Sequence, residues 1–101
     1  MNMPAVALDG AITNVHVGFA PGVINATQSS FTVGGKPILR QGDPVGDHVL
    51  IADPTKKHMG MSVSAGASTF TVAGKPVARM GDATNCGGLI AIGFGSFSVG
   101  G

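Results

Sequence analysis

Four side chains of the sequence carry the donor atoms of a metal site. They are all of its histidines and its single cysteine: His16, His48, His58 and Cys86. Three imidazoles and a thiolate complete the tetrahedral shell of a zinc ion. The ligands would come from four separated places, because the chain has neither a Cys-x₂-Cys pair nor a His-x₃₋₅-His pair. Ordinary loop histidines and a small buried cysteine would give the same spacing, so both interpretations stay open at this point.

Catalysis by such a metal is disfavoured, because a catalytic zinc keeps one coordination position open and usually has a general base nearby. Four protein ligands leave no opening, and the chain has no glutamate among its five acidic residues. Asp47 adjoins His48 and could orient that ring. A Ser–His–Asp arrangement stays open, but the sequence contains no nucleophile elbow. We therefore expect a protein that is not an enzyme.

The elements that must position these ligands belong to a sequence repeat. Residues 30–43 align without gaps on residues 69–82. A third copy is split between the chain ends, with its first half in residues 96–101 and its second half in residues 3–7. Ends that complement each other favour a closed body over a stacked solenoid, whose terminal repeats would be capped. The sequence therefore predicts a body with pseudo-three-fold symmetry.

Each unit is predicted to form a β-hairpin. An alternating Phe-x-Val segment is followed by a glycine turn, where positive φ is easily adopted, and Pro37 or Pro76 opens the return strand. Apolar strands separate the units, at residues 23–26, 61–65 and 89–92. The four candidate ligands all lie in the segments between units. In a three-fold arrangement these segments would converge at one end of an all-β body.

Composition limits the size of the core. The chain of 101 residues has 17 glycines, five phenylalanines and neither tryptophan nor tyrosine. A small domain of this kind usually needs disulfides, a metal or a partner, and one cysteine excludes an internal disulfide. The net charge is +1 and the six lysines and arginines are scattered along the chain, which does not suggest a nucleic-acid surface. No cationic leader precedes an apolar run, so we expect a chain made in the cytoplasm without a signal peptide.

The repeated unit resembles that of a known family. Residues 37–40 (Pro-Ile-Leu-Arg) and 76–79 (Pro-Val-Ala-Arg) resemble the Pro-Ala-Ala-Arg motif of PAAR-repeat proteins. The wider unit, Phe-Thr-Val-Gly-Gly-Lys-Pro-x-x-Arg-x-Gly-Asp, is similar to the repeat of that family over nearly the whole chain. The resemblance implies a small pointed cone of short β-hairpins with zinc near its vertex. Three histidines and a cysteine bind the metal in that family, which corresponds here to His16, His48, His58 and Cys86.

The resemblance also implies a function and a partner. Such proteins cap the trimeric β-helical spike of type VI secretion systems and of related contractile phage tails, and they sharpen it for piercing a target cell envelope. One copy of the chain would sit on each trimeric spike protein, touch the target membrane transiently and travel out of the cell, with or without an effector cargo. The runner-up function is a free-standing zinc-stabilised binding module or adaptor. The candidate docking face is formed by the repeated turns: Gly34, Gly35, Lys36, Gly74, Lys75 and Gly100.

Two features depart from the regular repeat. The N-terminal half-unit, aligned from Pro4, lacks the arginine and reverses the Gly-Asp order at Asp9 and Gly10. We therefore expect the third unit to be irregular. The last predicted strand stops at Gly101, so we expect residues 1–101 to form a single domain without a fused effector. The recurring arginines, Arg40 and Arg79, would either be solvated charges that protect strand edges or contact the partner.

Overall fold

The computed structural model describes residues 4–16 and 18–100. The regular structure of this part of the chain consists of short β-strands: β1 (Ala5–Val6), β2 (Thr32–Val33), β3 (Lys36–Pro37), β4 (Pro44–Val45), β5 (His48–Leu50), β6 (Asp53–His58), β7 (Met61–Ser62), β8 (Thr71–Val72), β9 (Lys75–Pro76) and β10 (Phe94–Ser98). In these residues no helix has the length and apolar character needed to cross a membrane.

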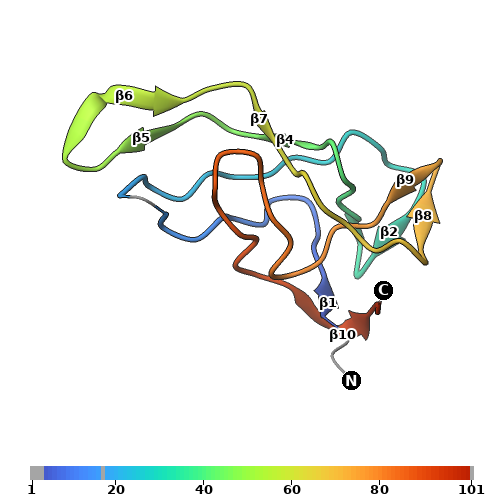
Figure 1. The fold of residues 1–101 in the computed structure, drawn as a ribbon. Helices are drawn as coiled ribbons and strands as arrows, with labels where there is room; N and C mark the ends of the chain where they lie inside the picture. Colours follow the sequence, from blue (N-terminus) through green and yellow to red (C-terminus); the bar gives the residue numbers. More distant parts are fainter. Residues whose placement is uncertain (1–3, 17, 101) are drawn as a thin grey trace.

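The strands form five antiparallel pairs. The repeated units form the hairpins β2–β3 and β8–β9, with the same register: Thr32 opposite Pro37, and Thr71 opposite Pro76. β1 pairs with β10, so the two chain ends complete the third unit. β2, β8 and β9 lie at one end of the body, and the β5–β6 hairpin projects at the other (Figure 1). The predicted all-β fold of short hairpins is confirmed.

The three units meet in a closed ring of backbone hydrogen bonds. The N–H of Ala7 donates to Ala78 O, that of Ala78 to Leu39 O, and that of Leu39 to Ala7 O, each at 2.9 Å. All three residues are completely buried. A second ring surrounds the first, in which each donor is a residue of one unit and each acceptor belongs to the next: Asp9 N to Pro37 O, Gln41 N to Pro76 O and Met80 N to Ala5 O, all 2.8 Å. Because the rings close, these segments have no free strand edge towards the axis.

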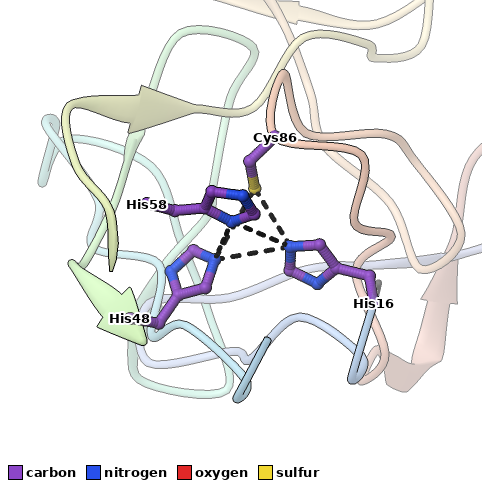
Figure 2. A group of neighbouring side chains, drawn as sticks. All are labelled: His16, His48, His58 and Cys86. Atoms are coloured by element: carbon purple, nitrogen blue, oxygen red, sulfur yellow. Dashed lines mark hydrogen bonds between the residues drawn. The ribbon is translucent and has the colours of Figure 1, made fainter. Parts of the chain in front are cut away.

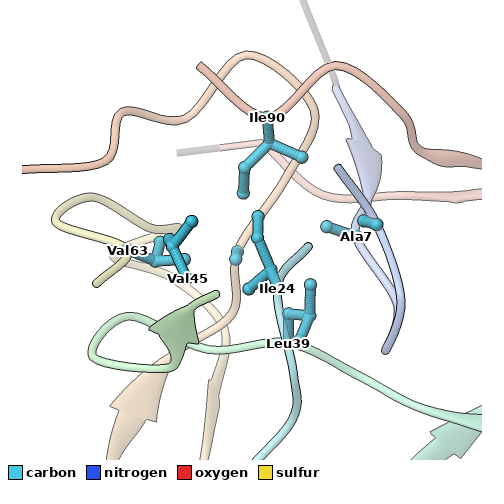
Figure 3. Packing of buried hydrophobic residues seen from close by; sticks show 8 residues of the cluster. Ala7, Ile24, Leu39, Val45, Val63 and Ile90 are labelled. Carbon is cyan, nitrogen blue, oxygen red and sulfur yellow. The ribbon is translucent and has the colours of Figure 1, made fainter. Parts of the chain in front are cut away.

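The apolar side chains follow the same symmetry. Ile24, Val63 and Ile90 come from the three apolar segments between the units, and each is at most 1% exposed. They pack with Ala7, Leu39 and Ala78 in one cluster (Figure 3). A second cluster contains Val6, Ile38 and Val77, with the half-buried phenylalanines Phe31, Phe70 and Phe97 packed against it. The fully buried part of both clusters consists of alanine and aliphatic side chains, while the phenylalanines stay at its margin.

The N-terminal half-unit is one residue out of the register that the sequence suggested. Ala5, not Pro4, takes the place of Pro37, because Ala5 pairs with Ser98 as Pro37 pairs with Thr32. Gly10 therefore corresponds to the glycine that precedes aspartate in the other units. All three glycines have positive φ, +90° at Gly10, +96° at Gly42 and +90° at Gly81. The Gly-Asp order is not reversed: the glycine is kept, and Ala11 stands where the others have aspartate. The expected irregularity is present as a register shift between Ala5 and Val6.

The two repeated arginines connect neighbouring units, so both expectations for them were wrong. Arg40 Nη1 donates to Val72 O (3.1 Å), on β8 of the next unit, and Arg79 Nη1 donates to Val99 O (3.4 Å), directly after β10 of the third unit. Arg40 is 6% exposed. Leu8 occupies the third position. These side chains are internal cross-links, neither solvated charges nor a partner surface.

The aspartates of the repeat have a structural role. Asp43 and Asp82 each accept the backbone N–H of the arginine three residues before, at 2.8 and 2.7 Å. Asp82 also pairs with the Arg79 side chain. These bonds fix the turn that follows each return strand, and so they set the direction in which the chain leaves for the far end of the body.

The β8–β9 turn contains a strained alanine, which gives a test of the repeat. Ala73 has φ +50°, whereas Gly34 takes the same place in β2–β3 with φ +59°. A left-handed backbone costs a non-glycine residue roughly 1–2 kcal/mol, and the greater freedom of glycine in the unfolded chain offsets part of this. We expect Ala73→Gly to raise the free energy of unfolding in urea by up to about 1 kcal/mol. The reverse change, Gly34→Ala, should lower it, since its Cβ would also lie 3.0 Å from the Phe94 ring. Destabilisation by Ala73→Gly would contradict the equivalence of the turns.

Candidate metal centre

The four predicted ligands converge on one point. The ligand atoms of His16, His48, His58 and Cys86 all lie within 4.8 Å of one another (Figure 2). His48 Nε2 is 3.0 Å from His58 Nδ1 and 3.4 Å from His16 Nε2, and the latter is 3.3 Å from His58 Nδ1. Cys86 Sγ lies 3.4 Å from His16 Nε2 and 3.7 Å from His48 Nε2. Zinc–nitrogen bonds of about 2.0–2.1 Å place tetrahedral nitrogen ligands roughly 3.3 Å apart, so the cage has the size of a zinc site.

Pseudo-symmetry explains why two histidines face each other. Asn14, Gly46 and Asn85 are equivalent, since each donates its N–H to the neighbouring apolar strand, at Leu89 O, Val23 O and Ser62 O. His16 and His48 follow two residues after the first two of these positions. The same place in the third unit is Gly87, and the residue before it, Cys86, supplies the sulfur. Equivalent segments thus deliver three ligands to the axis.

The fourth candidate ligand comes from a feature that, among residues 4–16 and 18–100, is found in the middle unit alone. The β5–β6 hairpin extends this unit, and its register places His58 directly opposite His48. One hairpin therefore contributes two ligands, one from each strand. A body with three units brings four candidate ligands together in this way.

Backbone carbonyls set the orientation of two rings. His16 Nδ1 lies 2.9 Å from Asn14 O, and His48 Nδ1 lies 2.9 Å from Gly46 O. Each Nδ1–H therefore donates to a carbonyl, which leaves the Nε2 lone pair directed at the cage. Two such lone pairs 3.4 Å apart have no proton to share, and a cation between them removes the repulsion. The donor set therefore fits a bound metal.

The prediction that Asp47 orients the ring of His48 was wrong. The carbonyl of Gly46 takes that role, and the Asp47 side chain is exposed.

Burial is the largest cause that lowers the pKa of His58, and the neighbouring His48 and His16 lower it further. The neutral imidazole is thus favoured, which is the form that binds a metal.

Two glycines that the sequence did not single out as site residues make room for the histidines. A Cβ on Gly22 would lie 2.6 Å from His48 Nδ1, and one on Gly88 would lie 2.9 Å from His16 Nδ1. Neither glycine has positive φ, so close approach, not backbone conformation, requires them. A repeat alignment could have found them, because both lie just before an apolar strand.

Phe19 is a further residue of the site that the sequence did not reveal. Its ring stacks on that of His58, with centroids 3.6 Å apart and planes 13° from parallel. It meets the His48 ring edge-on at 6.2 Å. Phe19 lies outside the repeated units, so repeat analysis gave no signal for it. In this position it covers one side of the cage and shields His58.

The predicted docking residues lie away from the cage. The turns that contain Gly34, Gly35 and Lys36, and Gly74 and Lys75, are at the end of the body opposite the β5–β6 hairpin (Figure 1). Gly100 joins them, because its carbonyl accepts a hydrogen bond from Thr69 Oγ1 just before β8. Both lysines are exposed. The chain therefore separates the two predicted sites, but binding at these turns stays a prediction.

The chain shares its repeated unit with a known protein family. Residues 17–91 match the family model described as PAAR motif, which is well over half of the chain. The chain belongs to the PAAR motif family. This family is associated with the spike tips of type VI secretion and is structural rather than enzymatic. Among curated proteins none matches the chain. The matched region includes three of the four residues of the cage, and His16 precedes it by one position.

The two glycines beside the histidines provide a test of the cage. Gly22→Ala and Gly88→Ala should each displace a ring and weaken metal binding by roughly 10-fold or more, as changes around metal ligands commonly do. Affinity can be measured by competition with a chromophoric chelator. Gly95→Ala is the matched control, because a Cβ there meets nothing within 4 Å. Equal affinity in all three variants would show that the rings are not held where the structure places them.

Proposed function

We propose that this chain is a metal-stapled tip that caps the trimeric β-helical spike of a type VI secretion system or contractile phage tail and helps it pierce a target envelope. The observation that carries the proposal is that the candidate metal cage and the repeated turns lie at opposite ends of the body (Figure 1). A cage of four ligand residues lies at one end, and turns from pseudo-equivalent units lie at the other. Family membership supports the same function.

The metal that suits this cage best is zinc. Nitrogen and thiolate donors in a tetrahedron are typical of structural zinc, whereas magnesium and calcium prefer oxygen. Bound there, the ion would supply folding free energy where the apolar core ends. His16, His48, His58 and Cys86 would hold it, and the Asn14 and Gly46 carbonyls would keep two rings aligned. With all four positions taken by protein, the site would staple the vertex segments together and would not catalyse a reaction.

Docking at the opposite end would use the pseudo-symmetry. The hairpins β2–β3, β8–β9 and β1–β10 are the three equivalents, and each could meet one identical subunit of a trimer. One chain per trimer then satisfies three contacts at once. The exposed strand ends of a β-helix would be covered, which removes a site of aggregation. Lys36 and Lys75 occupy the same place in two of these hairpins and could pair with carboxylates of the spike.

Force along the axis would pass through the rings of backbone hydrogen bonds around Ala7, Leu39 and Ala78. Each ring joins all three units, so load on one unit is shared by the others. The metal would do the same at the vertex, where four separate segments meet. The tip would leave the producing cell with the spike, to which a cargo could also be attached.

Paired charge reversals test the docking face. We expect Lys36→Glu with Lys75→Glu to weaken binding to the trimeric spike protein encoded in the same genome by about 10-fold, because like charges would replace complementary ones at the interface. Lys56→Glu with Lys57→Glu is the control, since it makes the same change of charge on exposed residues of the β5–β6 hairpin. It should leave binding unchanged. Native mass spectrometry should give one chain per trimer.

The opposite results would be as informative. Loss of binding only in the β5–β6 variant would place the docking face at the metal end and reverse the proposed orientation. No binding of the unaltered chain to any β-helical trimer would favour the alternative function, a free-standing metal-stabilised binding module.

A further inference from the structure

Thr84 lies directly beside the sulfur of the cage. Its Oγ1 is 3.2 Å from Cys86 Sγ. The side chain is buried, with 3% of its surface exposed. The same hydroxyl accepts the Gly88 N–H at 3.2 Å and lies 3.2 Å from Gly88 O. The hydroxyl therefore has two acceptors within reach and one proton to donate.

The contacts of the two acceptors indicate where that proton goes. Gly88 O already accepts the backbone N–H of Thr84 at 2.9 Å. A metal-bound cysteine is a thiolate, which only accepts hydrogen bonds, and a bond to an ionised acceptor is about twice as strong as a neutral one. The ring nitrogens near Sγ direct lone pairs at the cage and cannot supply a proton. The thiolate is thus the better acceptor.

We propose that Thr84 is a positioning residue of the metal site, whose hydroxyl donates to the Cys86 thiolate and fixes the direction of its sulfur. This inference rests on the proposed metal binding. It adds that the hydrogen bond from Thr84 helps to determine how strongly Cys86 binds the metal. The donated bond offsets part of the negative charge on sulfur and holds the cysteine side chain in the orientation that faces the three rings.

The other units show which part of this arrangement is structural. Thr13 is the equivalent residue of the first unit: it is completely buried, and its Oγ1 accepts the Gly22 N–H at 2.9 Å. Two residues later the first unit has Val15 in place of Cys86. In the middle unit the equivalent position is Val45, which is 3% exposed. A valine therefore fits this position of the fold, and the bond to sulfur is an addition made only by Thr84.

These equivalents give an experiment with a built-in control. Thr84→Val, Thr13→Val and Thr84→Ser are prepared as full chains and loaded with Co²⁺, whose thiolate charge-transfer band reports on the sulfur. Thr84→Val should move this band to lower energy and weaken Co²⁺ binding by roughly 10-fold. Thr13→Val loses the same bond to a glycine N–H but should keep the band, and Thr84→Ser should restore both readouts.

An identical band and affinity in Thr84→Val and Thr13→Val would overturn the proposal. If Thr84→Val does not fold, Thr84→Ala removes the same hydroxyl without adding volume and gives the same readouts. Failure of the proposed metal site gives a different result: the unaltered chain would then take up no Co²⁺ or show no thiolate band, whatever the variants do.

Discussion

The closed ring of hydrogen bonds among Ala7, Leu39 and Ala78 is the constraint on which the rest of the structure depends. It brings the backbones of three segments within hydrogen-bonding distance of one another around a common axis. The side chains of these residues must therefore pack without solvent between them. Because one segment follows the N-terminus and pairs with the C-terminal strand, closure also requires the two chain ends to form one unit. The apolar layer of Ile24, Val63 and Ile90 and the directions of the loops beyond it follow from this ring.

At the cage, the symmetry of the body does not match the coordination number of the proposed zinc ion. Three equivalent segments can offer three ligands, whereas a structural zinc site needs four. The β5–β6 hairpin supplies the missing ligand, His58, and the third unit replaces histidine by a cysteine one position earlier. The vertex therefore departs from the symmetry, as does the N-terminal half-unit with its register shift between Ala5 and Val6. Gly22 and Gly88 leave room for the rings of His48 and His16 at the vertex, and Phe19 stacks on His58, so residues outside the cage also fit the histidines.

Much of this arrangement could be predicted from the sequence, for physical reasons. A hairpin repeat with complementary ends predicts closure, and closure brings the segments between units to one end, which located all four residues of the cage. The alignment of the N-terminal half-unit could not be predicted correctly, because Pro4 matches the proline of the motif in residue type. Only the strand pairing shows that Ala5 takes the position of that proline. The inward course of Arg40 and Arg79, and the contacts of Thr84, depend on distances between units that no local pattern encodes.

The most direct test of the central claim is the metal content of the purified chain, measured with its free energy of unfolding before and after chelation. We expect about one zinc ion per chain. Removal of the ion should lower the free energy of unfolding or abolish the cooperative transition, because the free energy of metal binding contributes to folding at such a site. Cys86→Ser combined with His48→Ala should lose both the metal and this stability. A chain without stoichiometric metal, or one whose unfolding is unchanged by chelation, would contradict the stapled vertex.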